Sequence, residues 1–114
     1  MLSKKYRLVG SNEFKRVQNE GHVYQSKSFG IAYFKREDSE ASRFAFVVST
    51  KIAKEAVDRN RFKRTMSESV RIATIDLHPG FDVIFLAKTS IVSVPASELM
   101  KEVREGLKAS GLSN

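Results

Sequence analysis

The chain has 114 residues, a formal net charge of +7 and no cysteine. This length suits one compact domain and is short for two, so we expect a single domain over residues 1–114. A hydrophobic fraction of 41% argues against disorder, and the lack of cysteine excludes disulfides and thiolate catalysis. No apolar run is long enough for a signal peptide or a membrane span, so we expect a cytoplasmic protein without a membrane partner. The basic charge makes nucleic acid the first candidate partner.

The first half of the chain predicts one helix followed by strands. Residues 11–20 form a short amphipathic pattern, with Ser11 as the expected N-cap and Gly21 as the stop. Three strands are expected after it, "HVYQS" at 22–26, "FGIAYFKR" at 29–36 and "RFAFVVST" at 43–50. The acidic turn between the second and third strands predicts that these two pair as a hairpin.

The second half predicts helix, strand and helix. Residues 51–76 contain neither Pro nor Gly and favour a long helix. "FDVIFLAK" at 81–88 is an apolar run of strand length, which indicates a central strand buried on both faces. A last helix begins near Pro95, with Leu99, Val103 and Leu107 on one stripe. The expected order is αβββαβα, an α+β fold.

The stretch "AVDRNRFKRTMSESVR", residues 56–71, concentrates positive charge on a predicted helix. Four cations fall within six positions, namely Arg59, Arg61, Lys63 and Arg64. One narrow apolar stripe is expected to dock the helix, formed by Phe62, Met66, Val70 and Ala73. Acids are expected to pair only at the two ends, Glu55 with Arg59 and Glu68 with Arg64. An ordinary solvated helix face is one interpretation, but the basic charge and Asn60 favour a surface for nucleic acid.

The longer stretch "FVVSTKIAKEAVDRNRFKRTMSESVR" resembles the signature of the bacterial ribonuclease P protein family. The signature comprises a basic block, an Ala-Val pair or its equivalent, Arg-Asn-Arg, an apolar residue and Lys-Arg. Here these positions are Lys51, Ala56, Val57, Arg59, Asn60, Arg61, Phe62, Lys63 and Arg64. The resemblance extends to the first helix and to the strands. The chain departs from the pattern in residues 52–55, where the family commonly has a second basic and then a small residue. Ser67 stands where the family commonly has Arg, and Gln18 where it often has an aromatic residue.

The resemblance implies a fold, a partner and a division of labour. It implies a two-layer α+β sandwich like the second domain of ribosomal protein S5, with a left-handed βαβ crossover. It also implies that a catalytic RNA hydrolyses precursor tRNA with Mg²⁺, which that RNA binds, and that the protein is a monomer outside the ribonucleoprotein. The basic segment would then contact the catalytic RNA. Its candidate RNA-binding residues are Lys51, Lys54, Arg59, Asn60, Arg61, Lys63 and Arg64.

A second surface is implied for the single-stranded 5′ leader of precursor tRNA, between the first helix and the sheet. The candidate residues are Phe14, Gln18, Lys27, Gly30, Ala32 and Phe34. Phe14 offers a ring on which a base could stack, although a core position is an equal alternative. Gly30, Ala32 and Phe34 share one strand face, where two small side chains would leave room for RNA. Arg36 and Arg43 are further candidates for phosphate contacts.

No catalytic constellation is evident in the sequence itself. The dense acidic group Glu37, Asp38 and Glu40 lies in a predicted turn, where a solvated loop is the simpler interpretation. The two histidines, His22 and His78, lie at element ends and predict ordinary surface roles. Two alternatives to a ribonuclease P subunit remain open. One is an RNA-binding module without a role in catalysis, ribosomal or chaperone-like, and the other is a protein-only metal nuclease.

Overall fold

The structure is a computed structural model that describes residues 2–114. Its helices and strands follow the predicted order, which confirms the mixed α+β class. They are α1 (Ser11–Glu20), β1 (His22–Gln25), β2 (Phe29–Lys35), β3 (Arg43–Val47), α2 (Ala56–Ile72), β4 (Phe81–Ala87) and α3 (Ala96–Ala109). Short 3-10 turns lie at Lys4–Tyr6, Thr74–Asp76 and Thr89–Ser93.

The four strands form one open sheet in the order β1-β2-β4-β3. β4 pairs antiparallel with β2 and parallel with β3, and Val83 lies opposite both Tyr33 and Phe44. The predicted hairpin between β2 and β3 is therefore wrong, because β4 lies between them. β4 carries the apolar residues that a central strand needs on both faces, so it takes the place next to each of its neighbours. Helix α2 provides the crossover that a parallel β3–β4 pair requires.

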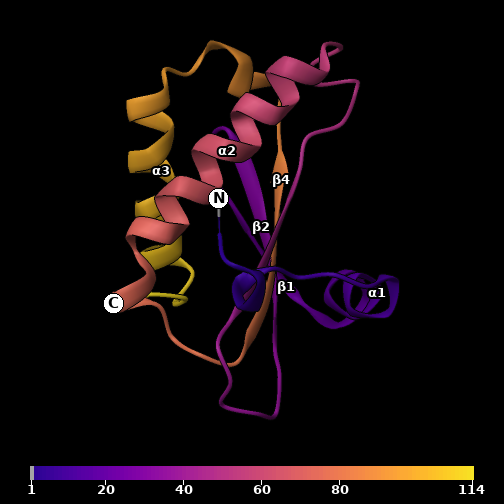
Figure 1. Cartoon of the computed structure of the whole chain (residues 1–114), viewed down its shortest axis with the longest axis vertical. Helices are drawn as coiled ribbons and strands as arrows, with labels where there is room; N and C mark the ends of the chain where they lie inside the picture. Colours follow the sequence, from indigo (N-terminus) through magenta and orange to yellow (C-terminus); the bar gives the residue numbers. More distant parts are fainter. Residues whose placement is uncertain (1) are drawn as a thin grey trace.

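The helices cover the two faces of the sheet unequally (Figure 1). α2 and α3 pack together on one face, and α1 lies alone against β2 and β4 on the other. The larger core lies between the sheet and the helix pair and includes Phe29, Ile31 and Phe85. The smaller core lies under α1 and includes Val17 and Ile84. The alternation along β2 follows the prediction, but the face of Gly30, Ala32 and Phe34, expected to leave room for RNA, meets the smaller core.

The predicted stripe of α2 is buried, with Phe62 5%, Met66 0%, Val70 0% and Ala73 9% exposed. The helix begins at Ala56 and not at residue 51. Residues 51–55 form a turn in which the backbone N–H groups of Ile52 and Ala53 donate to the carbonyl of Ser49. This 51–55 turn precedes the first residue of α2. Figure 1 shows the 51–55 turn and the 36–42 turn at opposite ends of the longest axis of the molecule.

Two glycines allow close approach between elements. Gly21, the residue after α1, has an ordinary φ of −84°, so it is not needed for a left-handed cap. A Cβ at this position would lie 2.4 Å from the carbonyl oxygen of Val17 and 2.6 Å from that of Tyr33. Gly106 on α3 similarly places a Cβ 3.1 Å from Ile31 Cδ1. Gly21 thus lets α1 end against β2, and Gly106 lets α3 approach the sheet.

Candidate nucleic-acid interface

The first candidate surface is the start of α2 with the turn that precedes it. We call this the basic surface; its members are Lys51, Lys54, Arg59, Asn60, Arg61, Lys63 and Arg64. All are exposed except Arg59 and Lys63, which are half-buried. The helix register therefore turns the cations outward while Phe62 and Met66 anchor the opposite side.

Arg59 differs from its neighbours because its guanidinium is engaged by the backbone. Its Nη1 donates to the carbonyl oxygens of Ala53, at 3.0 Å, and Lys54, at 2.6 Å. These bonds hold the turn before α2, and the expected pair of Arg59 with Glu55 does not form among the described residues. Arg59 therefore shapes the basic surface as well as contributing charge to it.

The other acids near α2 also pair differently from expectation. Asp58 lies 3.5 Å from Arg61, an exposed pair one turn apart. Glu68 pairs with Arg71 and not with Arg64, and the hydrogen bond from Arg71 holds the pKa of the Glu68 carboxyl below its usual range. Arg64 is consequently an exposed cation with no ion pair inside residues 2–114.

Ser67 is buried at 2% exposure, and its hydroxyl donates to the carbonyl oxygen of Arg64 at 3.0 Å. It lines an apolar hollow together with Lys63 and Arg7. An arginine at this position would start from the protein interior and not from the outer face of the helix. The departure at Ser67 therefore changes packing and does not simply delete an exposed contact.

The second candidate surface lies on the α1 side of the sheet. Gln18 is exposed, and Phe14 and Phe34 are half-buried beside the smaller core. Ala32, at 3% exposure, and Gly30 are both buried. They share one face of β2, as predicted, but this face does not leave open space for RNA. Val17 of α1 packs in the same cluster as Ala32, and the side chain of Gln25 on β1 lies beside Gly30. Accessible aromatic surface thus remains at the rim, at Phe14 and Phe34.

Lys27 does not belong to this surface. It lies beside Glu98, Lys101 and Glu102 of α3, on the side of the sheet opposite α1. This position separates Lys27 from Phe14, and a contact of Lys27 with a leader phosphate stays a prediction. Lys27 falls in the turn between β1 and β2, and this turn folds toward α3 because Glu102 binds it.

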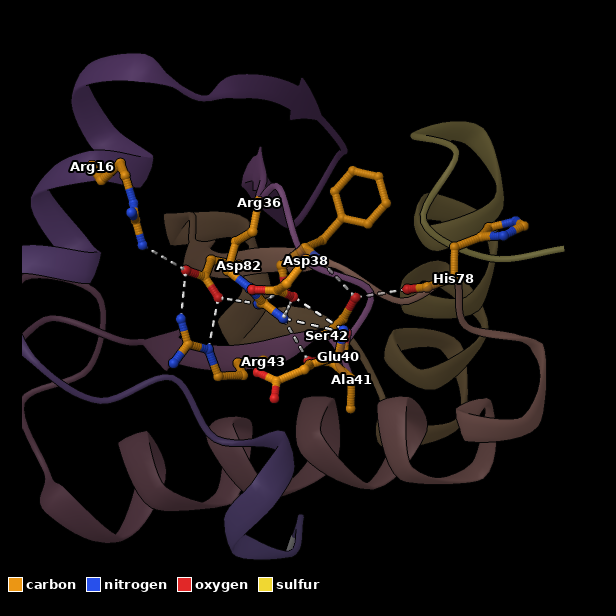
Figure 2. Close-up of polar contacts among 10 residues, drawn as sticks. Arg16, Arg36, Asp38, Glu40, Ala41, Ser42, Arg43, His78 and Asp82 are labelled. Carbon is orange, nitrogen blue, oxygen red and sulfur yellow. Dashed lines mark hydrogen bonds and ion pairs between the residues drawn. The ribbon is translucent and has the colours of Figure 1, made fainter.

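A buried carboxylate organises one end of the α1 side (Figure 2). Asp82 on β4 is fully buried and lies across from Phe34 on β2 and Arg43 on β3. Its Oδ1 accepts hydrogen bonds from Arg36 Nη1 at 2.6 Å and from Arg43 Nε at 2.8 Å. Its Oδ2 accepts from Arg43 Nη2 at 2.9 Å, and Arg16 Nη2 lies 3.7 Å away. A single carboxylate thus gathers three guanidinium groups.

The guanidinium of Arg36 uses its N–H donors in hydrogen bonds inside the protein. Besides Asp82 it donates to Asp38 and to the carbonyl oxygens of Phe81 and Ala41. Burial alone would lower the pKa of Arg36, but its hydrogen bonds to Asp38 and Asp82 outweigh that effect and raise the pKa. The bond from Arg36 in turn lowers the pKa of Asp38. Arg36 therefore fastens the 36–42 turn and has no donors to spare for a phosphate.

Sequence reasoning included Arg36 and Arg43 but missed Asp82 and Arg16. The signal was a carboxylate inside the apolar run "FDVIFLAK". A buried charge is tolerated only with partners, so Asp82 alone predicts that cations converge on β4. Which cations converge depends on strand order, and the expected hairpin concealed that Arg43 lies next to Asp82.

Among residues 2–114, no cluster of three or more His, Cys, Asp or Glu side chains is placed to hold a metal ion. Asp38 of the acidic turn is tied to Arg36 and accepts the backbone N–H of Glu40. The backbone carbonyl of His78 accepts from Ser42 Oγ. Within the same residues, no helix is long and apolar enough to cross a membrane.

Fold and surfaces together define a small basic α+β protein with exposed cations on α2. A second feature is an arginine cluster around Asp82, formed by Arg16, Arg36 and Arg43. The chain matches the Ribonuclease P family over residues 2–110 and belongs to it. The ribonuclease P protein component of Caldanaerobacter subterraneus subsp. tengcongensis is 33% identical over 112 residues, covering 98% of this chain and 95% of the relative. That of Oceanobacillus iheyensis is 29% identical over 111 residues, covering 97% and 91%.

Solved structures share the fold. The ribonuclease P protein of Staphylococcus aureus superposes with a TM-score of 0.89 at 22% identity, covering 97% of this chain and all of that one, 100%. The ribonuclease P protein of Thermotoga maritima gives a TM-score of 0.81 at 24% identity, covering 90% and 96%. The open four-stranded sheet with its three helices is therefore the architecture of this family.

Proposed function

We propose that this chain is the protein subunit of a bacterial ribonuclease P, which removes the 5′ leader from precursor tRNA. The observation that carries the proposal is the family match over residues 2–110, nearly the whole chain. The relatives are named as the protein component of that enzyme. The chain would act in the cytoplasm, as a monomer until it joins the ribonucleoprotein.

The chemistry in this proposal is divided between RNA and protein. The RNA subunit, with its Mg²⁺ ions, hydrolyses the phosphodiester bond, and the chain's own residues bind and orient RNA. The chain supports its share through guanidinium and ammonium groups, which neutralise phosphates and release their counterions. Several acidic side chains within residues 2–114 are engaged in internal pairs such as Arg36–Asp82, and these residues contain no group of three placed to hold a metal.

The basic surface is proposed to bind the RNA subunit. Its cations are exposed along one helix, and Arg64 has no competing ion pair among the described residues. Asn60, also exposed, offers both a donor and an acceptor to backbone or sugar groups. A rigid helix presents these groups at fixed spacing because Phe62 and Met66 anchor it in the core.

The α1 side of the sheet is proposed to bind the 5′ leader. Phe14 and Phe34 provide half-exposed rings, and base stacking on such rings contributes about 1–3 kcal/mol per base. Gln18 is exposed one turn after Phe14 and offers an amide in place of a ring. Leader contacts would thus lie on the opposite side of the sheet from α3.

The test is cleavage of precursor tRNA by the ribonuclease P RNA of the source organism at low Mg²⁺, with and without this protein. We expect the protein to stimulate the RNA subunit, and the protein alone to be inactive. Binding of RNA without stimulation would point instead to an RNA-binding module. Cleavage by a preparation freed of RNA would point to a protein-only nuclease.

A further inference from the structure

Arg16 lies on the exposed side of α1, and among Arg16, Arg36 and Arg43 it is the one that donates no hydrogen bond to residues 2–114. Its side chain is 42% exposed, and its nearest acidic atom is Asp82 Oδ2 at 3.7 Å, too far for a hydrogen bond. The Arg16 guanidinium donates no hydrogen bond within the described residues. It lines an open depression together with Phe34 and Arg43, so its N–H donors are available to a ligand there.

We propose that Arg16 binds a phosphate of the single-stranded 5′ leader, and that Asp82 and Phe34 are positioning residues for its guanidinium. The proposal rests on the function proposed above and adds a contact residue to it. Lys27, by contrast, lies beside α3, and the donors of Arg36 are used internally.

Two contacts hold the Arg16 guanidinium in place before RNA arrives. Its Cζ lies 5.2 Å from the centroid of the Phe34 ring, a distance typical of a cation–π contact. The Asp82 carboxylate attracts the guanidinium at 3.7 Å, while its three hydrogen bonds come from Arg36 and Arg43. Asp82 therefore fixes the position of Arg16 without consuming its donors. Pre-positioning of this kind reduces the entropy lost on binding.

Arg43 offers a second donor at the same depression. It holds Asp82 through Nε and Nη2, and its Nη1 makes no hydrogen bond to residues 2–114. Its side chain is 31% exposed. A phosphate between Arg16 and Arg43 would thus receive donors from α1 and from β3. Glu37 and Asp38 also line the depression and disfavour a second anion, so the depression suits one phosphate.

The chemistry favours a single strand over a duplex. An aromatic ring beside a guanidinium is the combination by which proteins hold unpaired nucleotides, because every base has a π-face and every linkage a phosphate. Phe14 and Gln18 lie on the same helix as Arg16, two positions before and after it, and so on the other flank of the buried Val17. A duplex would present phosphates but no base to either ring.

The experiment uses the reconstituted holoenzyme and precursor tRNA with either a long leader or none. Arg16→Ala should weaken binding of the long-leader substrate about tenfold, the effect of one charge-assisted hydrogen bond, and leave leaderless tRNA unaffected. It should also reduce the slope of log Kd against log salt by about 0.7. Lys15→Ala is the matched control, because it removes an equal charge from the next, exposed position of α1 and should leave both quantities unchanged.

Phe34→Leu tests the positioning role while keeping an apolar side chain at the site. It should weaken long-leader binding several-fold and leave the salt slope unchanged, since the Arg16 charge remains. Equal effects of Arg16→Ala and Lys15→Ala would overturn the proposal, as would an equal loss with leaderless tRNA. The unaltered protein must stimulate the RNA subunit in the same assay. Failure of this control would count against the proposed function, whereas the variant results test Arg16 alone.

Discussion

Glu102 on α3 accepts a hydrogen bond of 2.8 Å from the backbone N–H of Ser28, in the turn that joins β1 to β2. The hydroxyls of Ser28 and Ser26 donate to the same carboxylate. Lys88 closes the group by donating to the carbonyl oxygen of Ser26 at 2.6 Å. One acid thus ties the helix to a turn more than seventy positions away in sequence.

This carboxylate predicts a pH dependence of stability. Burial alone would raise the pKa of Glu102, but the hydrogen bonds from Ser26 and Ser28 outweigh burial and hold the pKa below its usual range. The stabilisation is therefore complete above the pKa of an unfolded glutamate, about 4.3, and is lost as pH falls through the folded value. Urea unfolding at pH 7 and at about pH 3.5 should show a smaller pH effect in Glu102→Gln than in the unaltered protein. Parallel curves would contradict this role.

Arg59 and Arg64, at the two ends of the cationic run, should differ in their effects. Arg59 should affect both stability and RNA binding, and Arg64 only RNA binding. Arg64→Ala should leave the free energy of unfolding within about 0.5 kcal/mol and reduce the salt slope of RNA-subunit binding by roughly 0.7–0.9. Arg59→Ala should reduce the same slope and also lower stability by about 1 kcal/mol, because it releases the carbonyls of Ala53 and Lys54. Filter binding over a salt series and chemical denaturation measure the two quantities. An unchanged slope for Arg64→Ala would return it to an ordinary surface role.

Ser67→Arg should destabilise the protein. From the sequence alone, restoring the family's Arg here is expected to tighten RNA binding. Ser67 is 2% exposed, and the hollow beside it already contains Lys63 and Arg7. A third cation has no acidic partner there, so we expect a loss of about 2–3 kcal/mol in the free energy of unfolding. Ser67→Ala is the smaller change and should cost about 1 kcal/mol. A stable variant with tighter RNA binding would restore the original expectation.

The elements were predictable because each has a local pattern, and the pairing was not. The stripe of α2 and the apolar run of β4 follow from spacing alone, and both are buried as expected. Strand order depends on which edge of β4 each strand finds, and the short acidic turn wrongly favoured a hairpin. The same error concealed the approach of Arg43 to Asp82, since their residues are neighbours only across β3 and β4.

The partners of individual side chains could not be predicted from the sequence either. Helical spacing allowed Arg64 to pair with Glu68, yet Arg71 takes that acid from the other side. Spacing likewise identified the face of Gly30 and Ala32 correctly, but not that α1 covers Ala32 and that Gln25 of β1 lies beside Gly30. Burial depends on the docking of a separate helix, which no local pattern specifies. Which residues of either surface touch RNA stays a prediction.

Gly21→Ala should weaken the junction between α1 and β2. Its φ of −84° suits any residue, so backbone strain is not the reason. The new Cβ would meet the carbonyl oxygens of Val17 and Tyr33 at 2.4 and 2.6 Å, and neither backbone group can move without shifting its element. We expect a loss of about 2 kcal/mol in the free energy of unfolding.

Gly30→Ala is the matched control for Gly21→Ala. There the nearest atom to a new Cβ is Oε1 of Gln25, at 3.3 Å, on a flexible side chain that can turn away. Alanine also restricts the unfolded chain, so stability should stay within about 0.5 kcal/mol of the unaltered protein. If both variants lost stability equally, the general cost of replacing glycine would explain the effect. A loss of stability in Gly21→Ala alone would instead show that the contact of α1 with β2 requires a residue without a side chain. The position of Arg16, which α1 carries, would then depend on Gly21 as well.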